Sequence, residues 1–163
     1  RVTLDLNGFS VIGPQTCSWD SDASDVDCTL TSSSGQRLII VEGAHNSLRN
    51  GTVKGALFIG VELRDPGPHV VENVHMTENG NTTIGGWGLA TFGSPTAAIV
   101  KNSTASLNLG EGFQGTVSTR FDNNLAYRNK FRGFVTGFCS NNTSVENGSS
   151  PYSTCTDLVG NAP

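Results

Sequence analysis

An asparagine recurs five times along this chain with similar neighbours, which is the pattern of a repeat protein. In each copy an apolar residue stands two positions before the asparagine, and a mostly small or apolar residue stands three positions after it. The five asparagines are Asn50, Asn73, Asn102, Asn123 and Asn141. Four copies carry a second asparagine six positions later, at Asn79, Asn108, Asn129 and Asn147. The first asparagines are 23, 29, 21 and 18 residues apart, and a period of about 20 with variable insertions is typical of a solenoid.

The repeats lack the apolar spacing of helices. In residues 1–7, Val2, Leu4 and Leu6 alternate with polar residues, as in a strand with one buried face. With 20 Gly and one Met, the composition favours short strands and tight turns. Asparagine tolerates the left-handed conformation of a sharp corner, and stacked asparagines can form a hydrogen-bonded ladder. The sequence therefore predicts an all-β fold, a parallel β-helix of about six coils that each rise about 4.8 Å, with the first asparagines as a structural ladder.

The opening segments resemble those of a known family. Residues 4–13 (LDLNGFSVIG) and 48–55 (LRNGTVKG) are similar to the first coils of secreted bacterial right-handed parallel β-helix repeat proteins of the pectate-lyase-like superfamily. The resemblance covers nearly the whole chain and implies a right-handed solenoid. Its motifs are specific for the fold and not for an activity. Family members usually carry further coils or a cap before this opening, so we expect a processed or truncated chain, or a first coil covered by something else.

Length and charge restrict the organisation and the partners. A chain of 163 residues with a net charge of −4 predicts one domain, 1–163, with insertions at about 14–37 and 148–163. No basic tract with interleaved aromatic residues occurs, which disfavours nucleic acid as a partner. No apolar run approaches the roughly 18 residues of a membrane span. No signal peptide opens the chain, so we expect any targeting segment to have been removed or to lie outside it.

The four cysteines form two local pairs in the sequence. Four cysteines allow three connectivities, but local pairing closes the shorter loops, and each local pair brackets an interruption of the repeat. We therefore predict the disulfides Cys17–Cys28 and Cys139–Cys155. The spacing matches no zinc site, and structural disulfides indicate an oxidising, extracellular compartment. Each bridge should contribute about 3 kcal/mol by restricting the unfolded chain.

Six sequons of the form Asn-x-Ser/Thr make this chain a candidate glycoprotein. They lie at Asn50, Asn81, Asn102, Asn141, Asn142 and Asn147. A glycan on either asparagine column would break the stacking of the side chains. Asn81 and Asn142 lie outside both columns, so they are the predicted glycosylation candidates.

An acidic segment lies between Cys17 and Cys28. Its four carboxylates are Asp20, Asp22, Asp25 and Asp27. Oxygen ligands at this density can hold Ca²⁺. The segment is no EF-hand, because Asp25 replaces the turn glycine and Thr31 replaces the closing glutamate. The competing interpretation, which we adopt, is a solvated acidic loop and no cofactor.

Catalytic residues are hard to find. A polysaccharide lyase on this fold needs acidic residues and an Arg or Lys base. The best candidates are Asp122, Arg128, Lys130 and Arg132, which could share one face on adjacent strands. Charged residues are also expected on the outside of any solenoid. A glycoside hydrolase needs two carboxylates about 5–10 Å apart, and the Asn-Thr-Asp, Asp-Asp and Gly-His-Gly motifs of similar hydrolases are absent.

The histidines and tryptophans provide few further candidates for a catalytic or binding site. His45, His69 and His75 have no matching Ser or Cys motif. Trp19 and Trp87 would stack on sugar rings if exposed. Trp87 follows two glycines in an insertion, where an aromatic residue more often caps the core.

Two functional classes remain. The first is a non-catalytic structural or adhesive extracellular protein that assembles end to end into filaments, because open strand edges and missing polar caps promote stacking. Its partner would be the chain itself, as an axial homopolymer. The second is a carbohydrate-active module, either polysaccharide-binding or lyase-like. The missing catalytic motifs, the short length and the absence of capping segments favour the first class.

Overall fold

All regular structure in this chain is β. The computed structural model describes residues 1–23, 25–31, 35–64, 67–93 and 97–162, and none of these residues lies in a helix. Fifteen strands form one sheet with parallel pairings, while β3 (Cys17–Asp20) and β4 (Asp25–Cys28) form a separate antiparallel hairpin. The predicted all-β class is confirmed, as the short alternating segments and the many turn-forming residues require.

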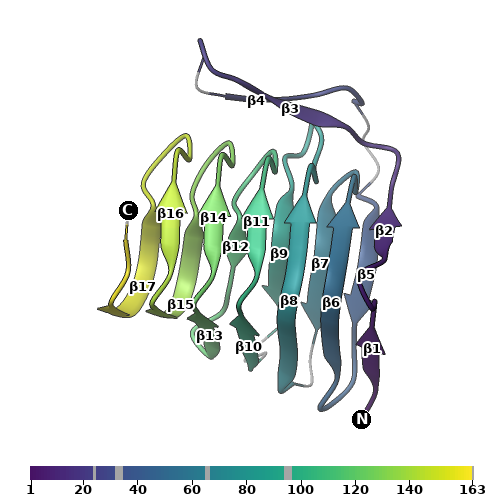
Figure 1. Ribbon diagram of the computed structural model, residues 1–163, viewed down its shortest axis with the longest axis vertical. Coiled ribbons are helices and arrows are strands. Elements are labelled where there is room, and N and C mark those ends of the chain that lie inside the picture. The colour runs from purple at the N-terminus through teal and green to yellow at the C-terminus, as the bar shows by residue number, and fades with distance from the viewer. Residues whose placement is uncertain (24, 32–34, 65–66, 94–96, 163) are drawn as a thin grey trace.

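The strands of the large sheet fall into three rows, in which equivalent strands of successive repeats pair in parallel. Row 1 contains β1 (Thr3–Asp5), the first part of β6 (Ser47–Lys54), the first part of β8 (His69–Thr77), β10 (Ala98–Lys101), β13 (Thr119–Asp122) and the end of β15 (Phe134–Ser140). Row 2 contains β2 (Ser10–Ile12), the second parts of β6 and β8, β11 (Thr104–Ser106), β14 (Leu125–Tyr127) and β16 (Thr143–Val145). Row 3 contains β5 (Arg37–Val41), β7 (Ile59–Arg64), β9 (Trp87–Phe92), β12 (Phe113–Gln114), the start of β15 and β17 (Tyr152–Val159). Figure 1 shows the repeats side by side from the N-terminus to the C-terminus.

Each row buries one column of side chains. In row 1 the buried column is Leu48, Val71, Val100, Phe121 and Cys139, all at most 1% exposed. The columns of the three rows meet in one apolar cluster. In row 3 the ring of Phe134 stacks on Phe113 at 5.0 Å and on Tyr152 at 5.3 Å. Because a buried Val, Leu or Phe side chain stabilises by about 1.5–3 kcal/mol, these aligned columns hold successive repeats in register.

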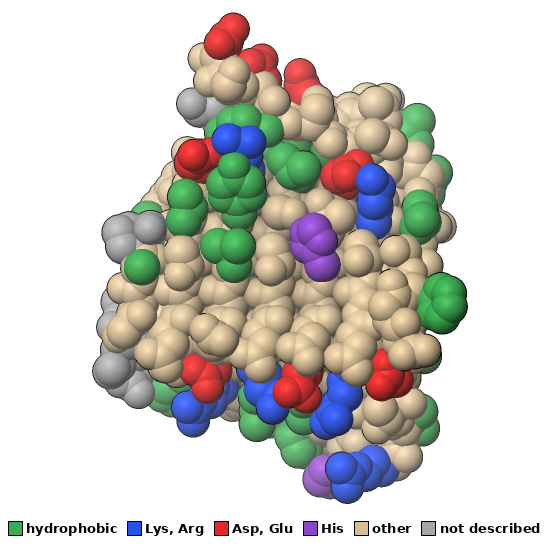
Figure 2. Space-filling model, viewed as in Figure 1, with side chains coloured by type: hydrophobic (Ala, Val, Ile, Leu, Met, Phe, Trp, Pro, Cys, Tyr) green, Lys and Arg blue, Asp and Glu red, His purple; other side chains and the backbone are tan. Residues whose placement is uncertain are grey.

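The outer side of row 1 carries charges of alternating sign. The column consists of Asp5, Arg49, Glu72, Lys101 and Asp122 in successive repeats. Glu72 lies 2.8 Å from Lys101 and 3.6 Å from Arg49, and the lysine holds the pKa of this carboxyl below its ordinary value. In Figure 2, acidic and basic side chains likewise alternate along one edge of a largely uncharged polar face. Alternation in adjacent strands avoids the repulsion of like charges.

Two corners in each repeat use residues with positive φ. The corner between rows 1 and 2 contains the first asparagines, Asn50, Asn73, Asn102, Asn123 and Asn141, with φ of 51° to 56°. The corner between rows 2 and 3 contains Glu78, Leu107, Arg128 and Glu146, with the same range of φ. Each of these four directly precedes one of the second asparagines. The left-handed conformation turns the chain sharply at both corners.

The second asparagines form a continuous buried ladder. Asn79, Asn108 and Asn129 are 0% exposed. The backbone N–H and the Nδ2 amide of Asn79 both donate to Oδ1 of Asn108, at 3.1 and 2.9 Å. Asn108 donates in the same way to Asn129, and Asn129 to Asn147. A shorter ladder of this kind joins Asn124, Asn142 and Asn161.

Two expectations need correction. The first asparagines occupy equivalent corners, but their side chains join only in pairs, Asn73 to Asn50 and Asn123 to Asn102. The Nδ2 amides of Asn50 and Asn141 donate instead to the row 1 carboxylates Asp5 and Asp122. The continuous ladder is formed by the second asparagines. Residues 148–163 are no simple insertion, because β17 pairs with β15 and extends row 3.

Candidate functional site

The β3–β4 hairpin lies across the corner between rows 2 and 3 of later repeats (Figure 1). Val26 is fully buried in a small apolar cluster with Cys17 and Leu109. Asp25 forms a 2.8 Å ion pair with Nζ of Lys130, which lies 105 residues further along the chain. The backbone N–H of Cys17 donates to Glu78 at 3.1 Å. Apolar burial and charge pairing therefore dock the hairpin at a defined place.

Two disulfides are present. Cys17–Cys28 joins directly paired residues of β3 and β4, and Cys139–Cys155 joins the adjacent strands β15 and β17. The first bridge closes the hairpin at its base. It thereby limits the conformations of the segment that carries Trp19.

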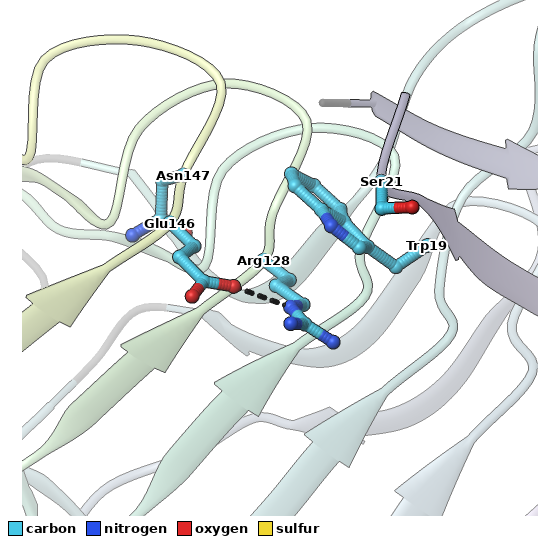
Figure 3. A pocket seen from close by; sticks show the side chains of 5 residues that line it. All are labelled: Trp19, Ser21, Arg128, Glu146 and Asn147. Atoms are coloured by element: carbon cyan, nitrogen blue, oxygen red, sulfur yellow. Dashed lines mark hydrogen bonds and ion pairs between the residues drawn. The ribbon is translucent and has the colours of Figure 1, made fainter. Parts of the chain in front are cut away.

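A cavity of about 360 Å³ opens between the hairpin and the corner. Its lining residues are Trp19 and Ser21 from the hairpin and Arg128, Glu146 and Asn147 from the corner (Figure 3). We call this cavity the hairpin cleft. The Asn147 side chain is held in the cleft lining by the asparagine ladder, because its amide is fully engaged with Asn129, Ala126 and Ser144.

Arg128 is the central side chain of the hairpin cleft. Its guanidinium carbon lies 4.7 Å from the ring centre of Tyr127 and 5.6 Å from that of Trp19. Its Nε donates to Glu146 at 2.6 Å. Among the described residues, no side chain or carbonyl accepts a hydrogen bond from its Nη1 or Nη2. The cleft thus offers an aromatic ring, a fixed guanidinium with free donors and a half-exposed carboxylate, a set suited to a ligand rich in hydroxyl groups.

The four catalytic candidates from the sequence do not meet. Asp122 lies in row 1, where it contacts Arg120 at 3.8 Å and Ser140 at 3.2 Å. The three cations pair with three different carboxylates, namely Arg128 with Glu146, Lys130 with Asp25 and Arg132 with Glu111. The expectation of one shared face is therefore wrong, because the chain turns a corner between Asp122 and Arg128.

Two of the four hairpin carboxylates, Asp20 and Asp25, have local structural roles. Asp20 accepts hydrogen bonds from the backbone N–H groups of Asp22 and Ala23 and so shapes the hairpin turn. Asp25 binds Lys130, and Asp27 lies opposite Ser18. Among the described residues, no three His, Cys, Asp or Glu side chains gather where a metal ion could be held. We base no calcium site on this hairpin.

Both predicted glycosylation candidates are buried. Asn81 and Asn142 are 0% exposed. The Nδ2 atom to which a glycan would be attached donates to the carbonyl of Leu57 in Asn81 and to that of Phe121 in Asn142. The expectation failed because Asn142 belongs to a third asparagine column that the sequence period does not reveal.

The remaining candidates lie outside the hairpin cleft. Trp87 packs on Phe58 with ring centres 4.9 Å apart and donates to Glu111 at 2.5 Å. His75 lies on the outer side of row 2, with Nε2 3.0 Å from the Ser106 hydroxyl. Sequence reasoning did not find Glu146, which has no motif. The opposite charges of Lys130 and the acidic hairpin were the only available hint of docking.

Comparison of the chain with protein-family models, with curated proteins and with solved structures finds no match. The described residues include no helix that is long and apolar enough to cross a membrane. The chemistry of the hairpin cleft is therefore inferred from its own residues.

Proposed function

We propose that this chain is a right-handed parallel β-helix of the pectate-lyase-like kind and that it acts outside the cell as a carbohydrate-binding module. The three parallel rows, the left-handed corners and the aligned core columns support this fold. The two disulfides fit an oxidising compartment. The ligand would lie in the hairpin cleft.

The observation that carries the proposal is the arrangement of Trp19, Arg128 and Glu146 around one cavity. The apolar face of a sugar ring packs on an aromatic ring, while its hydroxyl groups take hydrogen bonds from charged donors and acceptors. Tyr127 and Glu146 hold Arg128 in place before a ligand arrives. A preorganised side chain loses less conformational entropy on binding.

The charges around the cleft favour a neutral saccharide. Glu146 already balances Arg128, and Asp25 already balances Lys130. Asp20, Asp22 and Asp27 remain on the same hairpin. Their field would repel a polyanion such as a polyuronate, because fields of one sign select against ligands of that sign.

The cleft is suited to binding and not to glycoside hydrolysis. Among the described residues that line it, Glu146 is the one carboxylate, and it is held by Arg128 at 2.6 Å. The usual glycosidase mechanisms need two carboxyl groups, one of them protonated. We therefore propose no catalytic role for these residues.

Fluorescence titration tests the binding. In the Trp87→Phe variant, Trp19 is the only remaining tryptophan, so its emission reports on the cleft alone. We expect a saturable change with soluble neutral β-linked oligosaccharides and a weaker response with oligogalacturonides. Adding Arg128→Gln should weaken binding at least 10-fold, or about 1.4 kcal/mol. The matched control Arg132→Gln removes an arginine that pairs with Glu111 outside the cleft.

Three outcomes would count against this function. One is the absence of a saturable response with any saccharide. Another is an equal loss of affinity in the Arg128→Gln and Arg132→Gln variants. A preference for the oligogalacturonides would keep the cleft as the site but overturn the neutral ligand.

A second function, end-to-end self-association, is supported by the first repeat. Val2 is 66% exposed and Leu4 46% exposed, although Leu4 belongs to an alternating apolar pattern. Both side chains line a mostly apolar cavity of about 280 Å³, together with Ile39 and Ile40. In the described chain, β1, β2 and β5 pair on one edge only. A second copy could pair its β17 edge with β5 and continue row 3.

Sedimentation velocity at several concentrations, with electron microscopy of the same samples, tests this second function on the natural protein and on recombinant variants. We expect concentration-dependent oligomers that disappear in a Leu4→Lys variant. The control Val117→Lys changes a residue that is 72% exposed and lies between β12 and β13. A natural protein that stays monomeric at all concentrations would contradict self-association.

A further inference from the structure

In the structure, the asparagine side-chain amides of the six sequons differ in burial and in hydrogen bonding. N-linked glycosylation joins a sugar to Nδ2 of asparagine, so the folded protein must leave this atom accessible. Asn81 and Asn142 are buried. Asn147 donates from Nδ2 to Ala126 and Ser144, within the buried ladder. Asn50 donates from Nδ2 to Asp5 at 3.0 Å. Asn142 and Asn147 use both amide hydrogens, so a glycan there would displace a formed hydrogen bond. Asn81 has no exposed surface, and Asn50 is only partly exposed.

Asn102 is arranged differently. It is exposed at the corner between rows 1 and 2, with φ of 51°. Its Oδ1 accepts a 2.8 Å hydrogen bond from Nδ2 of Asn123. Its own Nδ2 has no acceptor among the described residues. Because glycosylation changes Nδ2 and leaves Oδ1 as an acceptor, a glycan at Asn102 preserves the contact with Asn123.

Asn141 occupies the same corner two repeats further along. It is exposed, with φ of 53°. Its Nδ2 makes one long contact, 3.4 Å to Asp122. Glycosylation replaces one of the two amide hydrogens, so the other remains available for this contact. With a rise of about 4.8 Å per repeat, the two asparagines would lie about 10 Å apart.

The hydroxyl groups of both sequons are also accessible. Thr104 and Thr143 each stand two residues after the asparagine and begin a strand of row 2. Both are partly exposed, on the outer side of the row. Both also line shallow surface hollows beside the corner, together with Asn102. The asparagine and the threonine of each sequon therefore face solvent, while the middle residues, Ser103 and Asn142, are buried.

We propose that the protein carries N-linked glycans at Asn102 and Asn141 and at none of the other four sequons. The transfer forms a bond between Nδ2 and C1 of an oligosaccharide. It breaks the bond between C1 and the oxygen of a lipid diphosphate donor, which leaves, and it releases one amide proton. This proposal is independent of the hairpin cleft, because the two asparagines lie at the opposite corner of row 2 from Arg128.

Enzymatic release of the glycans in H₂¹⁸O tests the proposal on the protein from its natural source. Release converts each occupied asparagine to an ¹⁸O-labelled aspartate, which peptide mass spectrometry locates. We expect label at Asn102 and Asn141 only. Any other pattern, including no label, overturns the proposal.

Variants secreted from a glycosylating eukaryotic host test the sites one at a time. Thr104→Val and Thr143→Val destroy the sequons without changing the positive-φ residues, so each should lower the intact mass by one glycan. Asn73→Gln is the matched control, because Asn73 lies in the same column without a sequon. Loss of a glycan in the control, or unchanged mass in either threonine variant, contradicts the assignment.

Discussion

The two corners of each repeat use asparagine for different physical purposes. At the outer corner, residues such as Asn102 and Asn123 adopt positive φ, and their amides face water. At the inner position, Asn108 has no exposed surface and connects its neighbours on both sides by hydrogen bonds. The outer asparagines thus provide a backbone conformation, while the inner ones satisfy buried polar groups. The same residue at a similar period has two functions that stability measurements can separate.

The largest effect should come from the inner position. In Asn108→Ala, the backbone N–H and the Nδ2 amide of Asn79 lose their shared acceptor inside the core. An unsatisfied buried group costs about 1–3 kcal/mol, so we expect a loss of about 3 kcal/mol or more. Urea denaturation followed by circular dichroism measures this loss. If the variant does not fold, Asn129→Ala, nearer to the end of the ladder, provides a second test.

A smaller effect should come from the outer corner. Asn123 has φ of 53°, where alanine costs roughly 1–2 kcal/mol and glycine has no steric penalty. We therefore expect Asn123→Ala to lose about 1 kcal/mol and Asn123→Gly to lose less. The same denaturation experiment measures both. Equal losses in Asn108→Ala and Asn123→Ala would refute the division between the corners.

Periodicity alone could identify both asparagine columns but not their functions. The sequence shows that asparagines recur at the positions of Asn123 and Asn129, and it also indicates strands and corners between them. Burial depends on which side of the strand faces the core, and the inserted residues obscure that register. The column of Asn124, Asn142 and Asn161 was missed because its earlier repeats contain other residues, such as Ser103.

The hairpin cleft was even less accessible to sequence reasoning. Local spacing was enough to predict the bridge between Cys17 and Cys28, since it closes a short loop. The contact between Asp25 and Lys130 spans 105 residues, and no local pattern encodes it. Glu146 became a candidate only because the corner of the last repeat brings it to Arg128. Repeat proteins reveal their strands in the sequence, while contacts made by their insertions require the structure.

The smallest expected effect is the pH dependence that His75 adds to the outer face. Loss of hydration lowers the pKa of His75 below its ordinary 6.5, and Lys54 acts in the same direction while Glu78 opposes it. The unfolded chain therefore takes up a proton at a higher pH than the folded chain. The stability that the folded state gains from a neutral His75 is therefore fully present above about pH 6.5, and it is lost as the pH falls toward the pKa of His75 in the folded protein.

When the pH falls from 7.5 to 5.5, the free energy of unfolding should therefore decrease more in the wild-type protein than in His75→Gln. The difference between these two decreases should be smaller than the loss caused by Asn123→Ala. Thermal unfolding at the two pH values measures the difference, with His45→Asn as the control on an exposed turn. An equal loss in the wild type and in His75→Gln would assign the pH dependence to other groups. Asparagine does not titrate, so the difference in stability between Asn108→Ala and Asn123→Ala should be the same at both pH values. A change in that difference would mean that protonation reaches the ladder, and the two corners would then be coupled and not independent.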